Sequence, residues 1–185
     1  MKKEYTHAKG FNVTSLKEVA GLYFFHNIKG EVEYIGKCNN DFKNRINSHG
    51  YGLHGKLSPE TVYLRVIIAD PINYPLHVLE NFFIWYFGSQ KNKSLWLFSG
   101  VENEKGLKKI AKSHNLYIRG SLEKFILSFE SVLIKREWDE NNKNIRYGEI
   151  EQLSSREIFC DSTQSCLCYR CLVIAERKNK GILYL

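Results

Sequence analysis

The feature that most constrains this chain is a pair of short apolar segments joined by a polar turn. Residues 21–25 and 31–37 are rich in aromatic and β-branched side chains, and residues 27–30 lie between them. This composition predicts two antiparallel strands joined by a tight turn. If the turn has an even number of residues, Tyr23 lies directly opposite Tyr34, whereas a bulged turn would shift that pairing. We therefore expect two tyrosines on one face of a β-hairpin.

A third strand and two helices follow the hairpin. Residues 61–69 are apolar almost throughout, which is typical of a central strand. Residues 42–49 and 76–87 place apolar side chains at helical spacing, before and after that strand. The chain is therefore predicted to be α/β, with helices flanking a small three-stranded antiparallel sheet made of residues 21–27, 31–38 and 61–69.

Length and charge narrow the class of protein. The chain has 185 residues, enough for a domain whose core needs no disulfide. Its 27 Lys and Arg against 20 Asp and Glu give a net charge of +7, which suits nucleic acid, although a lysine-rich soluble surface explains the charge equally well. We see no transmembrane run and no secretory leader, and so expect a cytoplasmic protein that does not enter a membrane.

Two of the predicted helices carry polar side chains that indicate a site. Arg45 and His49 are four residues apart on the first helix, so they share a face. Glu80 is the one acidic residue of the second helix, and a carboxylate buried there without a partner would cost several kcal/mol. We therefore expect Glu80 to reach a cation or a solvent-filled cleft. The alternative is a narrow exposed stripe shared with His77 and Asn81.

Taken together, these residues resemble the GIY-YIG nuclease family, whose signature is a Gly-x-Tyr triplet followed along a hairpin by Tyr-Ile-Gly. Gly21-Leu22-Tyr23 and Tyr34-Ile35-Gly36 stand in those places. The loop Cys38-Asn39-Asn40 holds one residue more than the commonest spacing, an insertion that costs little in a loop. Four further residues follow in the family's order and at fitting intervals: Lys37, Arg45, Glu80 and Asn92.

The resemblance divides the chain into three parts. It implies a nuclease core at residues 19–97, preceded by an N-terminal arm at residues 1–18. Residues 98–185 are predicted to form a basic, mainly helical extension, with helices over residues 102–114 and 121–138. The cations and aromatic residues of this extension suit contact with DNA. A solvated helical layer that supports the core accounts for them as well.

The extension contains a cluster of cysteines. Four of the five cysteines fall between residues 160 and 171, and their spacing ends in C-x2-C, which is half of a zinc site. Four thiolates would make a closed structural zinc site, whereas four reduced cysteines explain the cluster equally well. Both alternatives stay open for the same four residues: Cys160, Cys166, Cys168 and Cys171.

The resemblance implies that the hairpin carries the general base. In nucleases of this family a tyrosine of the first triplet activates the attacking water, which points to Tyr23, with Tyr34 hydrogen-bonded in the same cluster. A free phenol has a pKa of about 10 and is a weak base at neutral pH. The positive charge of Lys37, on the same hairpin, is expected to favour the phenolate. The alternative role for Tyr34 is that of a core aromatic residue.

The remaining matched residues are assigned to the phosphate and to a metal ion. Arg45 is expected to hold non-bridging phosphate oxygens, and His49 to do the same or to orient a water. Glu80 is expected to hold one Mg²⁺, or Mn²⁺ in its place, which would polarise the phosphate and stabilise the leaving oxygen. Asn92 is expected to support the site by hydrogen bonding. The alternatives are a helix-end role for His49 and a turn-forming role for Asn92.

The function expected from the resemblance is metal-dependent hydrolysis of phosphodiester bonds by an endonuclease that acts on duplex DNA. A compact chain that joins a nuclease core to a basic extension favours a site-specific restriction-type enzyme, by analogy with the family. The alternatives are a repair or mobile-element nuclease of the same family and a non-catalytic, zinc-stabilised module that binds nucleic acid. Cutting both strands with one active site per chain would favour a homodimer.

Overall fold

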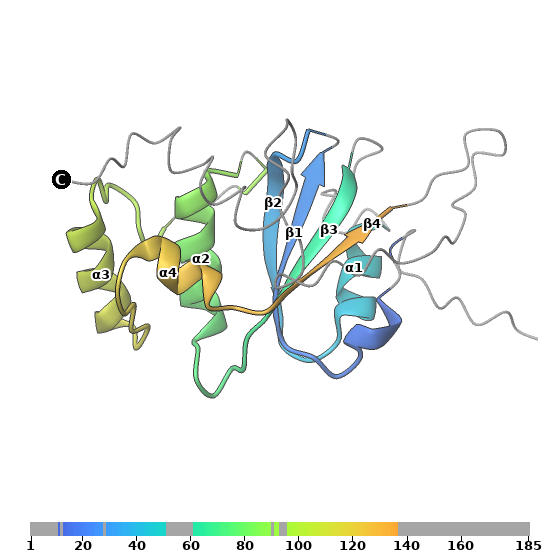
Figure 1. The fold of residues 1–185 in the computed structure, drawn as a ribbon, viewed down its shortest axis with the longest axis horizontal. Helices are drawn as coiled ribbons and strands as arrows, with labels where there is room; N and C mark the ends of the chain where they lie inside the picture. The colour runs from blue at the N-terminus through green and yellow to red at the C-terminus, as the bar shows by residue number, and fades with distance from the viewer. Residues whose placement is uncertain are drawn as a thin grey trace, which may run out of the picture.

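The described part of the chain folds into one antiparallel sheet with helices on both faces (Figure 1). The computed structural model describes residues 11, 13–27, 29–50, 61–89, 91–92 and 96–136. The elements in chain order are the 3-10 turn η1 (Thr14–Leu16), β1 (Gly21–Asn27), β2 (Val32–Cys38), α1 (Phe42–Gly50), β3 (Thr61–Ile68), α2 (Leu76–Phe87), α3 (Glu104–Ser113), α4 (Leu122–Leu127) and β4 (Ser131–Lys135). The α/β class expected from the sequence is confirmed.

Within the described residues the sheet has four strands in the order β2-β1-β3-β4, with every neighbouring pair antiparallel. The prediction of three strands was therefore one strand short, and the helix predicted over residues 121–138 is wrong beyond Leu127. The chain leaves α4 there and adds β4 to the open edge of β3. The run Val132-Leu133-Ile134 is apolar without interruption, and such a run suits a buried strand as well as a helix.

The hairpin register differs from the predicted one. Tyr23 pairs with Gly36 and Phe25 pairs with Tyr34, because the pairing shifts at a bulge between Phe25 and His26. The direct opposition of Tyr23 and Tyr34 is therefore wrong. The two tyrosines are diagonal neighbours on one face of the sheet, with their ring centroids 6.1 Å apart. The two side chains meet as expected, although the residue opposite Tyr23 is Gly36, two positions beyond Tyr34.

Two glycines allow the close packing of this hairpin. Gly21 has a φ of 153°, and a Cβ there would collide with the backbone carbonyl of Ile67 on β3. A Cβ on Gly36 would lie 2.8 Å from Cε1 of Tyr23 and closer still to its Cζ and Oη. The aromatic ring of Tyr23 therefore occupies the space that a side chain at position 36 would need. At both Gly21 and Gly36, therefore, the packing leaves no room for a side chain.

The two faces of the sheet carry separate hydrophobic cores. On one face, α1 contributes Phe42 and Ile46, which pack with Tyr23 and Phe25. On the other face lie α2, α3 and α4 (Figure 1), and their side chains form a larger core. That core joins residues from Leu22 to Phe129, so side chains on both sides of position 97 pack together. The division of the chain at residue 97 stays a prediction.

The helices of the described residues are short. Each of them lacks either the length or the apolar character that a bilayer-spanning segment requires. The longest is α2, whose twelve residues are mostly buried in the larger core. It ends at Gly88, which adopts the left-handed conformation (φ 63°) that commonly closes a helix.

Candidate active site

Tyr23 lies at the centre of a cluster of polar side chains inside the α1 face of the sheet. Its side chain is fully buried, and its hydroxyl contacts Nε2 of His49 and Nε of Arg45, the latter at 3.1 Å. Arginine only donates, so the phenol oxygen accepts from Arg45. The hydroxyl proton of Tyr23 is then free to be donated to His49. The sequence placed all three residues in the site, and the structure brings them together.

The helix α1 positions Arg45 and His49 on one side, as their spacing predicted. Asp41 caps the start of this helix, because its carboxylate accepts hydrogen bonds from the backbone N–H and the side-chain amide of Asn44 at 3.2 and 2.7 Å. The His49 ring is buried against Tyr23 and Tyr34, with centroids 5.3 and 5.2 Å away. His49 therefore contacts the tyrosines, and a buried ring has no surface on which to hold a phosphate.

Burial controls the protonation of the tyrosine pair. It raises the pKa of the Tyr23 hydroxyl far above its usual value, the neighbouring Tyr34 raises it further, and Arg45 lowers it in part. The pKa of Tyr34 is raised by burial and by the charge of Glu80, while hydrogen bonding with Tyr23 lowers it. Both phenols are neutral at neutral pH. The charge that favours a phenolate comes from Arg45, whereas Lys37 had been expected to supply it.

Lys37 and Glu80 form an ion pair between β2 and α2, with 3.7 Å between Nζ and Oε2. The Glu80 side chain is 18% exposed and that of Lys37 38%. Burial raises the pKa of Glu80, and the charges of Lys37 and Arg45 lower it. The alternative, an exposed stripe shared with His77 and Asn81, holds only in part: His77 is exposed, whereas Asn81 is only 4% exposed. Glu80 reaches a cation, as a largely buried carboxylate requires.

Asn92 is joined to the hairpin by its side-chain amide. Its Oδ1 accepts from the backbone N–H of Ile35 at 2.9 Å, and its Nδ2 donates to the Ile35 carbonyl at 2.8 Å. Ser89 donates a further hydrogen bond to the same Oδ1. Next to it, Nζ of Lys91 lies 2.6 Å from Oε1 of Glu33. Asn92 therefore holds β2 in place, and its support of the site stays a prediction.

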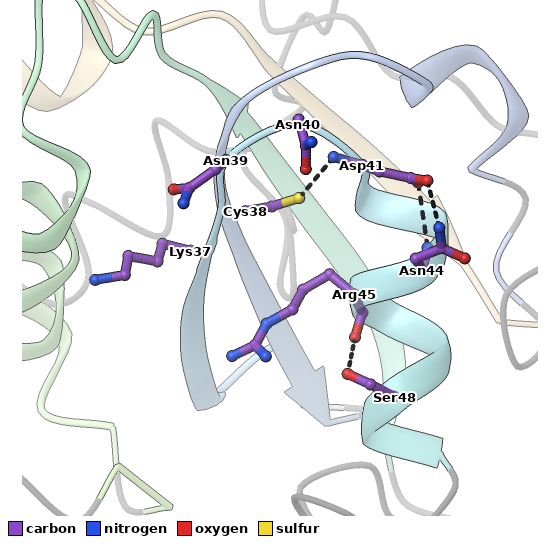
Figure 2. Close-up of a pocket in the computed structure, with 8 residues that line it drawn as sticks. All are labelled: Lys37, Cys38, Asn39, Asn40, Asp41, Asn44, Arg45 and Ser48. Carbon is purple, nitrogen blue, oxygen red and sulfur yellow. Dashed lines mark hydrogen bonds between the residues drawn. The ribbon is translucent and has the colours of Figure 1, made fainter.

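A pocket of about 550 Å³ opens beside these residues, at the end of β2 and the start of α1 (Figure 2). The sequence pointed to the two cations of its wall, Lys37 and Arg45, but not to a binding role for the other lining residues. The sequence did contain a signal: β2 and α1 both carry site residues, and the loop that joins them contains Asn39 and Asn40. The lining residues are Lys37, Cys38, Asn39, Asn40, Asp41, Asn44, Arg45 and Ser48.

Glu80 is the residue that fits a metal ion. Mg²⁺ keeps several waters and takes one or two carboxylates together with substrate phosphate oxygens, so one partly exposed carboxylate is a sufficient protein ligand. Within the described residues, no three His, Cys, Asp or Glu side chains gather into a metal site. The predicted zinc ligands lie outside the described residues: Cys160, Cys166, Cys168 and Cys171.

The site thus combines a buried phenol held by a base and a guanidinium, a second phenol at its side, and a carboxylate paired with a lysine. This set of groups can move a proton, bind an anion and hold a hard cation. In comparisons with known proteins, no family model, no curated protein and no solved structure matches this chain.

Proposed function

We propose that the protein is a metal-dependent endonuclease that hydrolyses phosphodiester bonds in DNA. The observation that carries the proposal is the Tyr23 hydroxyl held between Arg45 and His49, on the sheet face that also carries Tyr34. Hydrolysis of a phosphodiester needs a proton acceptor for the attacking water and positive charge at the phosphate. Glu80, paired with Lys37, adds a carboxylate for a metal ion, and its charge raises the pKa values of Tyr34 and Arg45.

The burial of Tyr23 changes how the base would work. Tyr23 has no exposed surface, whereas Tyr34 is partly exposed and hydrogen-bonds with it. The attacking water therefore gives its proton to the Tyr34 oxygen as its own oxygen bonds to phosphorus. The bond from phosphorus to the leaving oxygen breaks, and that oxygen takes up a proton from solvent. The Tyr34 proton passes to Tyr23, and the Tyr23 proton passes to Nε2 of His49. Arg45 stabilises the negative charge on the phenol oxygen during the transfer.

The phosphate is bound by the cations at the mouth of this cluster. Arg45 presents a guanidinium that suits two phosphate oxygens at once, and Lys37 adds a second positive charge. Glu80 would hold Mg²⁺ or Mn²⁺, which supplies Lewis-acid stabilisation of the leaving oxygen when bound. Phosphate would draw Lys37 away from its loose contact with Glu80, and this exchange frees the carboxylate for the ion.

The finer assignments follow the resemblance. Strands β1 to β3 with α1 and α2 would form the GIY-YIG core, and the remainder of the chain would contact duplex DNA in a restriction-type enzyme. Support comes from the net charge of +7 and from α3, which carries four lysines. Beyond α3, Tyr117 is 59% exposed and available for a nucleic acid contact. A homodimer and a cytoplasmic location belong to the same proposal.

Cleavage of plasmid DNA with Mg²⁺ tests the proposal. We expect the wild-type protein to cut, and expect Glu80→Gln, which keeps the shape of the side chain, to lose activity about 100-fold or more. Glu130→Gln is the matched control, since Glu130 is exposed and directly precedes β4, at the opposite edge of the sheet from β2. If wild-type protein binds the plasmid but leaves it intact with Mg²⁺ and with Mn²⁺, the chain is the alternative, a module that binds nucleic acid without cutting it.

Phenylalanine variants distinguish the roles of the two tyrosines. Tyr34→Phe and Tyr23→Phe should each reduce the rate by about 100-fold, because either change interrupts proton transfer to His49. Tyr74→Phe, which removes a hydroxyl outside the cluster, should keep the wild-type rate. Full activity of Tyr34→Phe beside an inactive Tyr23→Phe would show that Tyr23 meets the water directly.

A further inference from the structure

The pocket beside Arg45 contains polar groups that the proposed mechanism does not use. Its wall is the end of β2, the loop of residues 38–41 and the first turns of α1 (Figure 2). Two of these groups are already engaged. Ser48 donates to the Arg45 carbonyl at 2.7 Å, and the Asn44 amide donates to Asp41 at 2.7 Å. Asn39 and Asn40 remain.

The side chains of Asn39 and Asn40 are exposed, and no hydrogen bond joins either amide to another described side chain or backbone group. Both residues sit in a loop whose ends are held. Sγ of Cys38 accepts from the backbone N–H of Asp41 at 3.2 Å, and Asp41 bridges to Lys17 and caps α1. The loop therefore presents two open amides from a fixed backbone, which lowers the entropy that a ligand must overcome.

The position of these amides indicates their ligand. Lys37 and Arg45 border the same cavity, so a phosphate bound by them places the adjoining nucleotide against the loop. A carboxamide has one acceptor and two donors in a plane, and this pattern matches the edge of a base, above all that of adenine. The cations Lys37 and Arg45 suit the phosphate, and an asparagine amide can pair with N6 and N7 of adenine.

We propose that this pocket holds the nucleotide next to the scissile phosphate and that Asn39 and Asn40 select its base. The inference rests on the proposed nuclease function and adds to it a determinant of sequence preference.

The test uses duplex oligonucleotides that vary each base beside the cleavage site, with cleavage rates measured at every variant. Wild-type protein should prefer one base, with adenine expected, by about tenfold at one neighbouring position. Asn39→Ala with Asn40→Ala should reduce that preference to below about threefold and leave the preferences at the other positions unchanged. Asn47→Ala is the matched control, because Asn47 lies on α1 but does not line the pocket.

A second pair of variants tests the chemistry of the contact. Asn39→Asp and Asn40→Asp remove the amide donors, so the preferred base should shift from adenine towards cytosine, which offers a donor. Unchanged preference in all of these variants, at wild-type thermal stability, overturns the pocket inference alone. Wild-type protein that cuts no DNA with Mg²⁺ or Mn²⁺ overturns the proposed nuclease and the pocket inference together.

Discussion

Replacing Gly36 by alanine tests the packing on which the whole site depends. The new Cβ would lie 2.8 Å from Cε1 of Tyr23 and nearer to its Cζ and Oη, closer than folded proteins tolerate. Either β2 moves, or the ring turns away and loses its contacts with His49 and Arg45. Overpacking costs about 1–3 kcal/mol, and each lost hydrogen bond adds about 1 kcal/mol. We expect the free energy of unfolding to fall by about 3 kcal/mol.

A double-mutant cycle, with each variant unfolded in urea, tests whether the clash with Tyr23 causes this loss of stability. Leucine at position 23 lacks the ring atoms that meet the new Cβ, so in a Tyr23→Leu background Gly36→Ala should cost less than about 1 kcal/mol. The coupling free energy would then be about 2 kcal/mol. Gly106→Ala is the control, because its Cβ finds ordinary contacts and a helix favours alanine. Equal costs of Gly36→Ala in both backgrounds would refute the steric reasoning.

Two further predictions concern stability. Burial lowers the pKa of His26 from 6.5 to about 3. Below pH 6.5 the unfolded chain therefore binds a proton at this residue that the folded chain does not. The free energy of unfolding is highest above pH 6.5 and falls with the pH, by about 3 kcal/mol at about pH 4. His26→Gln should flatten this acid limb in urea titrations, whereas His114→Gln at an exposed position should not. Asn92→Ala should lower the free energy of unfolding by about 1–3 kcal/mol, because it removes both side-chain hydrogen bonds to Ile35. Faster hydrogen exchange at the Ile35 amide would confirm the cause, and unchanged exchange would contradict it.

The hairpin shows what a sequence of this kind can and cannot reveal. The alternation of side chains predicted that Tyr23 and Tyr34 share a face, and they do. Their exact pairing depended on a bulge beside His26, which is stabilised by contacts within the turn, such as the 3.0 Å hydrogen bond between Nδ1 of His26 and the Gly30 carbonyl. Local composition does not encode such a shift, so the register was wrong by one pair.

The site residues were predictable as a set, but their pairing in space was not. Arg45 and His49 follow from helical spacing, and Glu80 from the cost of burying a carboxylate. Which cation meets which anion depends on the alternation of side chains along β2, because Lys37 leaves this edge strand on the side where α2 packs and pairs there with Glu80. The strand β4 was missed for a related reason. Its apolar run fits a helix or a strand, and only the free edge of β3 decides between them.

The contacts of residues 91 and 92 have a consequence for association between molecules. Strand β2 ends the sheet on one side, and an uncovered strand edge invites pairing with another chain. Here the backbone N–H of Lys91 donates to the Glu33 carbonyl at 3.0 Å, and Asn92 occupies the N–H and carbonyl of Ile35. The strand that carries Tyr34 and Lys37 is thereby shielded from edge-to-edge addition. A dimer that cuts two DNA strands would have to form through a different surface and leave this edge with its own chain.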